Sequence, residues 1–138
     1  MKRVIQLSLV LALFISSFTF KAQDDKLKKS MDAGKGVYNG ICMACHLGEG
    51  QGIPSVFPPL AKSDYLMKDT DRAIETLIKG LSGEVTVNGT KYNQVMPPTG
   101  LDDQDIADVL NYVMNSWGNK AEKMVTKAKV AEVRADLD

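Results

Sequence analysis

The sequence has very few of the side chains that build metal clusters, with one histidine and two cysteines among 138 residues. A structural zinc site needs four such ligands, so zinc cannot organise this fold. The charges show no excess of either sign, because the sequence has 17 basic and 17 acidic side chains. A nucleic-acid-binding protein would carry a basic patch, so this class of function is excluded as well. The 25% charged and 44% hydrophobic fractions are ordinary for one soluble globular domain.

The N-terminal segment differs from the rest because residues 1–22 contain no acidic side chain. Lys2 and Arg3 precede a mostly apolar stretch over 4–20, and Ala22 supplies a small residue near a cleavage point. This order is typical of a secretory signal peptide, so we expect export to the periplasm and removal of the segment. An uncleaved membrane anchor is the alternative, although the stretch is short and interrupted by hydroxyl side chains.

After the signal peptide no second apolar span follows, and 14 basic and 17 acidic side chains leave a net charge of −3. We therefore expect no membrane insertion after signal cleavage. Residues 23–118 are predicted to form one largely helical domain. Residues 119–138 alternate charged and apolar side chains, which predicts a charged C-terminal extension that is either helical or mobile.

Hydrophobic periodicity predicts helices over 30–45, 69–79 and 101–117, and a short helix over 63–66. Ser30 or Asp32 is expected to cap the first of these helices by accepting backbone N–H bonds. The dipeptide Asn88-Gly89 separates two short runs rich in β-branched and aromatic residues. Since Asn and Gly tolerate the positive φ of a tight turn, this pattern predicts a β-hairpin.

The two cysteines and the histidine lie within five residues, Cys42-Met43-Ala44-Cys45-His46. This is the C-x-x-C-H pattern of c-type haem attachment, in which each thiol adds to one haem vinyl group and the histidine binds the iron. A thioredoxin-like pair would need a preceding strand, but a glycine-rich helix leads into this motif. A disulfide across two residues would be strained. The pattern predicts one haem c, attached through Cys42 and Cys45, with His46 as an iron ligand.

A single histidine excludes bis-histidine ligation and a second haem. The sixth position of the iron is then left to methionine, lysine, tyrosine, a backbone group, water or no ligand. Methionine would raise the reduction potential and suit an electron carrier. Met96 is favoured because the residue before a proline is held extended, which helps to project its side chain. Met114 is expected on an inward helical face as core filler, and Met43 lies inside the attachment loop. The other methionines after residue 22 are Met31, Met67 and Met124.

At these residues the sequence resembles the class I cytochrome c family from about residue 30 to residue 117. The resemblance implies an all-α fold wrapped round one haem, here with a small β-hairpin insertion before the methionine loop. It also implies that the carbonyl of Pro58 accepts the His46 N–H, that Leu60 packs on the haem and that Gly36 lets the first helix cross the last near Tyr112. The matching motifs are Gly36-x-Tyr38-x-x-x-Cys42-x-x-Cys45-His46, Phe57-Pro58-Pro59-Leu60 and Val95-Met96-Pro97-Pro98.

The insertion over 83–94 is similar to that of small cytochrome c domains associated with bacterial copper nitrite reductases and of cytochrome subunits of periplasmic dehydrogenases. One haem, a methionine ligand and no other catalytic group predict an electron carrier rather than an enzyme. The expected partners are redox proteins such as a periplasmic reductase, dehydrogenase or terminal oxidase, and the similarity does not fix which of them. Two alternatives stay open from the residues alone. One is a subunit docked on a larger oxidoreductase, and the other is an enzyme such as a peroxidase in which Met96 does not bind the iron.

Overall fold

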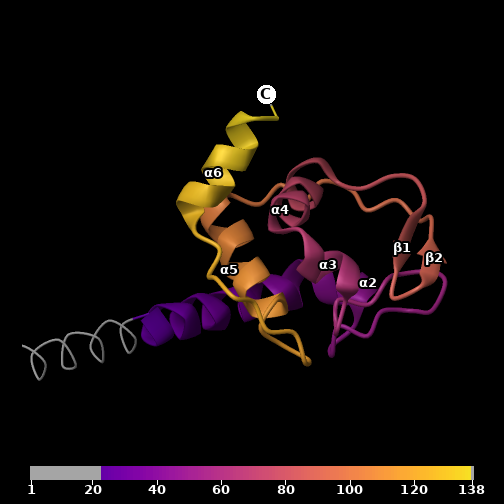
Figure 1. Cartoon of the computed structure of the whole chain (residues 1–138), viewed down its shortest axis with the longest axis horizontal. Coiled ribbons are helices and arrows are strands. Elements are labelled where there is room, and N and C mark those ends of the chain that lie inside the picture. Colours follow the sequence, from indigo (N-terminus) through magenta and orange to yellow (C-terminus); the bar gives the residue numbers. More distant parts are fainter. Residues whose placement is uncertain (1–22, 138) are drawn as a thin grey trace, which may run out of the picture.

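The computed structural model describes residues 23–137, so the predicted signal peptide lies outside the described residues. The described part is mostly helical and contains one two-stranded sheet (Figure 1). None of its helices is both long enough and apolar enough to span a lipid bilayer. The elements in chain order are a helical stretch over 23–37, the π-helix η1 (Tyr38–Cys42), α2 (Met43–His46), α3 (Asp64–Lys68), α4 (Thr70–Lys79), β1 (Val85–Val87), β2 (Thr90–Tyr92), α5 (Asp103–Val113) and α6 (Lys127–Ala135).

The first helix is already formed at residue 23, so the prediction that Ser30 or Asp32 caps its start is wrong. Ser30 lies inside the helix, where its side chain is buried. Its hydroxyl donates to the carboxylate of Asp108 and accepts a 2.9 Å hydrogen bond from the amide of Asn111. The polar side chain therefore has its partners on α5, far away in the sequence, rather than on the local backbone.

The first helix approaches α5 most closely at Gly34. A Cβ atom added to Gly34 would lie 1.9 Å from the carbonyl oxygen of Asp108, whereas one added to Gly36 would meet nothing within 4 Å. The expectation that Gly36 makes this crossing is therefore wrong. Two backbones can approach this closely only where one of them has no Cβ atom, and the packing register places Gly34 at that point.

Tyr112 of α5 lies in an aromatic cluster close to this crossing. Its ring centroid is 5.6 Å from that of Tyr38 and 5.3 Å from that of Trp117. Aromatic pairs at these distances and tilted angles are favourable beyond the area that they bury. The cluster therefore fixes the end of the first helix against the end of α5.

The predicted middle elements are confirmed. The side chain of Asp69 caps α4 by accepting the backbone N–H of Arg72 at 3.0 Å, and Gly80, with φ of 79°, ends the helix. In the hairpin the turn residues Asn88 and Gly89 have φ of 49° and 78°. Asn88 and Asp64 each donate a backbone N–H to the other's side chain, at 2.7 and 3.0 Å, so the hairpin turn is fastened to α3.

Helix α5 ends at Val113, four residues before the predicted end near Trp117. The chain turns there, because Trp117 and Gly118 have φ of 52° and 90°. The amide of the buried Asn119 then donates to the carbonyls of Leu60 and Val113, at 2.8 Å each. These hydrogen bonds tie the end of α5 to the loop that precedes α3.

The C-terminal extension folds back over the domain. Figure 1 shows α6 beside α5 and α4, and both helices contact it. Val125, Val130 and Val133 are buried in the same core as α5. The side chain of Asn111 donates to the Val125 carbonyl and accepts the Val125 N–H, at 2.8 Å each. The extension thus adds both apolar area and satisfied polar groups to the domain.

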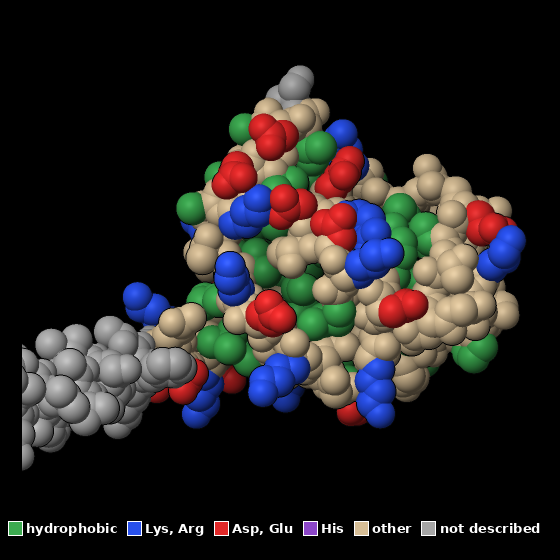
Figure 2. All heavy atoms as spheres, viewed as in Figure 1, with side chains coloured by type: hydrophobic (Ala, Val, Ile, Leu, Met, Phe, Trp, Pro, Cys, Tyr) green, Lys and Arg blue, Asp and Glu red, His purple; other side chains and the backbone are tan. Residues whose placement is uncertain are grey.

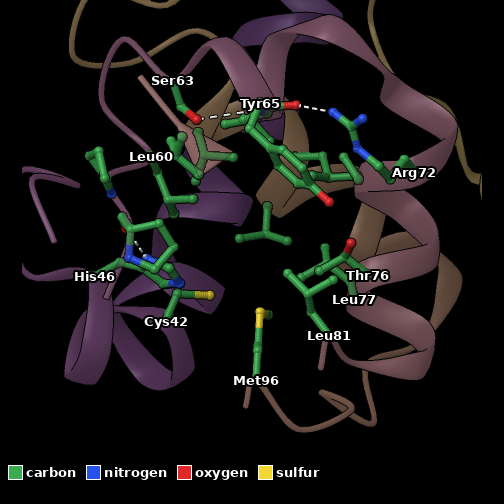
Figure 3. A pocket seen from close by; sticks show the side chains of 18 residues that line it. Cys42, His46, Leu60, Ser63, Tyr65, Arg72, Thr76, Leu77, Leu81 and Met96 are labelled. Atoms are coloured by element: carbon green, nitrogen blue, oxygen red, sulfur yellow. Dashed lines mark hydrogen bonds between the residues drawn. The ribbon is translucent and has the colours of Figure 1, made fainter. Parts of the chain in front are cut away.

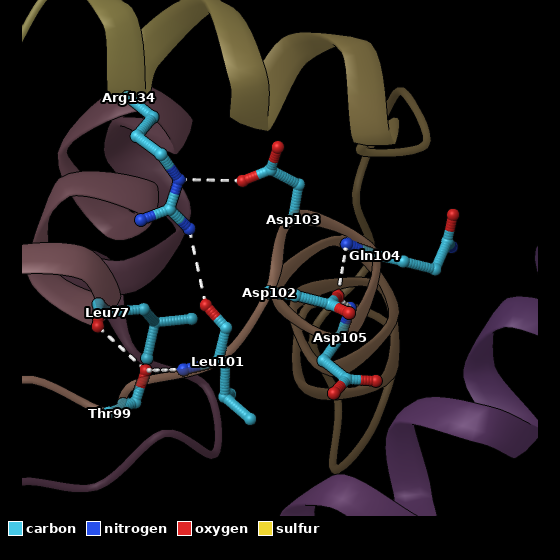
Figure 4. A network of polar contacts seen from close by, with 8 residues as sticks. All are labelled: Leu77, Thr99, Leu101, Asp102, Asp103, Gln104, Asp105 and Arg134. Atoms are coloured by element: carbon cyan, nitrogen blue, oxygen red, sulfur yellow. Dashed lines mark hydrogen bonds and ion pairs between the residues drawn. The ribbon is translucent and has the colours of Figure 1, made fainter.

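The C-terminal end of α6 is held to the start of α5 by an ion pair and a hydrogen bond of Arg134. Arg134 donates from Nε to the carboxylate of Asp103 at 2.7 Å and from Nη2 to the carbonyl of Leu101 at 3.2 Å (Figure 4). In the same view Asp102 accepts the backbone N–H groups of Gln104 and Asp105, at 2.8 and 2.9 Å. The Asp102 side chain therefore caps the start of α5, and the contact of Arg134 with Asp103 anchors that start to α6.

Gly34→Ala is expected to lower the free energy of unfolding by about 1–3 kcal/mol, because the added methyl group has no room against the Asp108 carbonyl. Gly36→Ala is the matched control. Its methyl group points into open space, and the higher helix propensity of Ala should stabilise it by about 1 kcal/mol. Urea unfolding of the haem-loaded variants, followed by far-ultraviolet circular dichroism, measures both changes. Equal effects of the two substitutions would contradict the crossing at Gly34.

Val130→Ala is expected to destabilise the domain by about 2 kcal/mol, because it leaves a cavity between α6 and the core. Lys127→Ala, at an exposed position of the same helix, should change the stability by less than about 0.5 kcal/mol. The same urea titration compares them. A Val130 variant as stable as the Lys127 variant would mean that the extension does not pack on the core in solution.

Candidate functional site

An apolar pocket lies between α2, the loop before α3, α4 and the loop that carries Met96 (Figure 3). α5 closes it from the core side through Val109, Leu110 and Val113. The lining is almost entirely hydrocarbon, so a bound group must be largely apolar and shielded from water. The remaining lining residues are Cys42, His46, Pro58, Pro59, Leu60, Ser63, Tyr65, Leu66, Arg72, Ala73, Thr76, Leu77, Leu81, Val87 and Met96.

His46 ends α2 and is buried against the pocket. Its Nδ1 lies 2.9 Å from the carbonyl oxygen of Pro58. A carbonyl can only accept, so Nδ1 carries the proton and Nε2 keeps its lone pair. Burial lowers the pKa of His46, against the opposing effect of the Pro58 carbonyl, and keeps the ring neutral. A neutral imidazole with a fixed tautomer is the form that binds a metal ion.

The two cysteines lie in different surroundings, Cys42 at the end of η1 and Cys45 in α2. Cys42 precedes His46 by four residues and shares its face of the helix, so both side chains line the pocket. Burial raises the pKa of the Cys42 thiol to about 11, with a further contribution from Cys45. Cys45 is exposed and does not line the pocket. Both are free thiols, so nothing in the protein blocks their reaction with a ligand.

Met96 approaches from the opposite wall, and Figure 3 shows its sulfur directed into the pocket. Its backbone is held by a two-way bridge with Leu81, where the Leu81 N–H donates at 2.8 Å and the Met96 N–H at 2.9 Å. Gly80 permits this approach, since a Cβ atom there would lie 2.5 Å from the Met96 carbonyl oxygen. The sequence indicated the extended conformation through Pro97, but it carried no signal for the bridge.

The structure brings five of the six predicted site residues to the pocket, namely Cys42, His46, Pro58, Leu60 and Met96, and leaves Cys45 on the exposed side of α2. Sequence reasoning missed the polar residues that α3 and α4 contribute. Arg72 and Thr76 are four residues apart on α4, so they share one face of that helix with the buried Leu77 next to Thr76. That spacing was the available signal for their position. Ser63 and Tyr65 of the α3 region could be placed only by the tertiary structure.

A haem fits this site by the chemistry of its donors. The pocket offers an imidazole nitrogen and a thioether sulfur on separate walls, a thiol beside the imidazole, and apolar surface between them. Imidazole and thioether are ligands of haem iron, and thiols form the covalent links of haem c. Among residues 23–137 no three His, Cys, Asp or Glu side chains gather to hold a metal ion by themselves. The site therefore suits iron that arrives within a porphyrin.

Comparison with known proteins also indicates a haem-binding cytochrome. The family model described as Cytochrome c matches residues 31–117. Cytochrome c-552 of Thermus thermophilus is 42% identical over 103 residues, which cover 68% of this chain and 79% of the relative. The cytochrome c subunit of the quinone alcohol dehydrogenase of Gluconobacter oxydans is 29% identical over 106 residues, covering 75% of this chain and 22% of that subunit.

A further relative is the gluconate 2-dehydrogenase cytochrome c subunit of Pantoea cypripedii. It is 32% identical over 130 residues, which cover 88% of this chain and 30% of that subunit. The chain thus spans less than a third of the dehydrogenase subunits, but most of the small cytochrome. The helical fold with its hairpin is the class I cytochrome c fold that the motifs implied. The chain belongs to the cytochrome c family, whose members hold haem covalently and transfer electrons.

Proposed function

We propose that this chain is a periplasmic monohaem cytochrome that carries single electrons between redox proteins. One haem c would be attached through Cys42 and Cys45, and its iron would be held by His46 and Met96. The observation that supports this most strongly is the placement of a tautomer-fixed imidazole and a methionine sulfur on separate walls of one apolar pocket. When bound, the haem iron supplies the one-electron chemistry by changing between the ferric and ferrous states.

The residues around the two ligands hold them in place. The Pro58 carbonyl orients the His46 ring, and the bridge to Leu81 fixes the backbone of Met96. Because neither ligand depends on a mobile side chain partner, little has to move when the iron charge changes. Small structural change means small reorganisation energy, which favours fast electron transfer.

The apolar lining of the pocket favours a raised reduction potential of the haem. Leu60, Leu77 and Leu110 exclude water from the pocket, and a low-polarity environment favours the less charged ferrous site. A thioether ligand from Met96 acts in the same direction. Both features favour a cytochrome of raised potential, suited to accept electrons from one protein and pass them to another.

The surface is compatible with several redox partners. On the face drawn in Figure 2, lysines and arginines are interspersed with aspartates and glutamates rather than gathered by sign. We infer partners such as a periplasmic reductase, dehydrogenase or terminal oxidase, and a chain that is soluble after signal cleavage. The chain itself is proposed to be a carrier and not an enzyme.

A second candidate is a subunit of a larger oxidoreductase, favoured by the similarity to dehydrogenase cytochrome subunits. Size-exclusion chromatography of the native protein from its own cells separates the two. A free carrier elutes as a monomer, at or below the 15.1 kDa of the whole chain, whereas a subunit co-elutes with dehydrogenase activity at a much larger size.

Met96→Leu is expected to abolish the weak far-red absorption band that a methionine sulfur gives on ferric haem, and to lower the midpoint potential, because leucine cannot bind iron. Met67→Leu is the matched control, since Met67 packs on the core without lining the pocket. Visible spectra and a redox titration report both properties. A band that survives in the Met96 variant would assign the sixth ligand to another residue.

Replacing Cys42 and Cys45 together by Ser is expected to release the haem on denaturation, because no thioether bond remains. Each single substitution should keep haem covalently bound and shift the pyridine haemochrome absorption to longer wavelength, since one vinyl group stays unsaturated. Haem staining of a denaturing gel and the haemochrome spectrum measure these outcomes after co-expression with a haem-ligation system. A wild-type chain without stain would overturn the proposed function.

A further inference from the structure

The loop that carries Met96 continues the β-hairpin. At the open end of the hairpin Val85 pairs with Tyr92, and the separate bridge pairs Leu81 with Met96. Leu81 lies four residues before Val85 and Met96 lies four residues after Tyr92, so the two sides between hairpin and bridge have equal length. The two segments run side by side in Figure 1. The bridge therefore keeps the register of the hairpin, although Gly83, with φ of 93°, interrupts the strand between them.

This register decides which side chains face the pocket. Along a strand successive side chains point to opposite faces, so positions two apart share a face. Leu81, Val87 and Met96 line the pocket, and Tyr92 is buried. The residues at the alternate positions are exposed, namely Ser82, Glu84, Thr86, Lys91 and Val95. A slip of one residue would turn every side chain to the other face, and would put Val95, now 69% exposed, in the place of Met96.

The hairpin is fixed at the end farthest from Met96. Its turn residues Asn88 and Gly89 have φ of 49° and 78°, the positive values of a two-residue turn that sets the pairing of its strands. Asn88 exchanges two hydrogen bonds with Asp64 of α3, at 2.7 and 3.0 Å. Val87, next to the turn, is only 2% exposed. Both the turn and the burial of its neighbour therefore hold the strands in this register.

The contacts on the other side of Met96 fix the path of the chain but not the direction of the side chain. Thr99 donates its N–H and its hydroxyl to the carbonyl of Leu77, at 3.1 and 2.8 Å. The two prolines between Met96 and Thr99 have no N–H, so strand pairing cannot continue through them. The alternation that directs Met96 inward must therefore come from the hairpin side.

We propose that the hairpin over 83–94 is a positioning element for Met96, because its turn sets the register in which the methionine sulfur enters the pocket. Asp64, Asn88 and Gly89 do not line the pocket and act only through this pairing. The inference rests on the proposed function, since it takes Met96 as an iron ligand. It makes the strength of the bond between sulfur and iron depend on residues that do not touch the haem.

The experiment uses the haem-loaded protein, with imidazole as a competing ligand for ferric haem. Displacement of the thioether removes the far-red methionine band, so an imidazole titration at fixed pH measures how firmly Met96 is held. Gly89→Val forces a β-branched residue into a positive φ without a clash, since a Cβ atom there meets nothing within 4 Å. Asp64→Ala removes the contact between the turn and α3. Thr90→Val is the matched control, because it places the same side chain at the next, exposed position of β2.

The affinity for imidazole is expected to rise about tenfold in Gly89→Val, because the strain of the turn is relieved when the hairpin opens. It should rise less in Asp64→Ala and stay unchanged in Thr90→Val. Val130→Ala is a second control, since Val130 lies on α6 and its loss lowers the overall stability without touching the hairpin.

Two results would overturn the inference and leave the proposed function intact. One is an unchanged imidazole affinity in both Gly89→Val and Asp64→Ala. The other is an equal rise in Val130→Ala, which would mean that the affinity follows overall stability. A wild type that holds covalent haem but lacks the far-red band would instead overturn the proposed ligation by Met96.

Hydrogen exchange of the wild type tests the same coupling and stays informative if Gly89→Val does not retain haem. The N–H of Met96 is compared with the hydrogen-bonded N–H groups of β1 and β2, whose exchange reports local opening. If the hairpin holds the ligand, the free energy of opening at Met96 is no higher than that of the hairpin. A Met96 N–H that stays protected after the hairpin groups have exchanged would contradict the proposal.

Discussion

The close contact between the backbones of the first helix and α5 is the constraint on which the site depends. At Gly34 the first helix lies directly against the Asp108 carbonyl, which fixes the direction in which the chain continues through η1 into α2. That direction turns Cys42 and His46 toward the face of α5 formed by Val109, Leu110 and Val113. A side chain at this crossing would move the two helices apart and open the pocket wall. The helix packing and the shape of the pocket therefore both depend on the missing Cβ atom at Gly34.

A buried polar network reinforces the crossing and extends it to the C-terminal segment. Ser30, Asp108 and Asn111 join the first helix to α5, and Asn111 in turn satisfies both backbone groups of Val125. Gln104 donates to Asp108 at 3.0 Å, so this carboxylate has partners from two helices. Buried polar groups destabilise a fold unless they are paired, and here the pairing defines where three segments meet. The extension therefore belongs to the same packed unit as the pocket.

The pocket combines two side chains that are rigidly held with one charged side chain that is not. His46 is oriented by a backbone carbonyl and Met96 by a backbone bridge, so both depend on main-chain positions that point substitutions rarely move. Arg72, in contrast, is held by Tyr65 alone and keeps a buried Nε without a partner.

The sequence by itself determined the elements whose cause is local. The C-x-x-C-H pattern indicated the cofactor and its proximal ligand, because covalent attachment requires a fixed spacing within one helical turn. Asn88-Gly89 predicted the hairpin, because turn preferences act between near neighbours. Only the tertiary structure decided which glycine makes the helix crossing, where Ser30 and Asn119 find their partners, and that Arg72 enters the pocket. Those features depend on contacts between residues far apart in the chain, and no periodicity or spacing within a segment specifies which distant backbone it will meet.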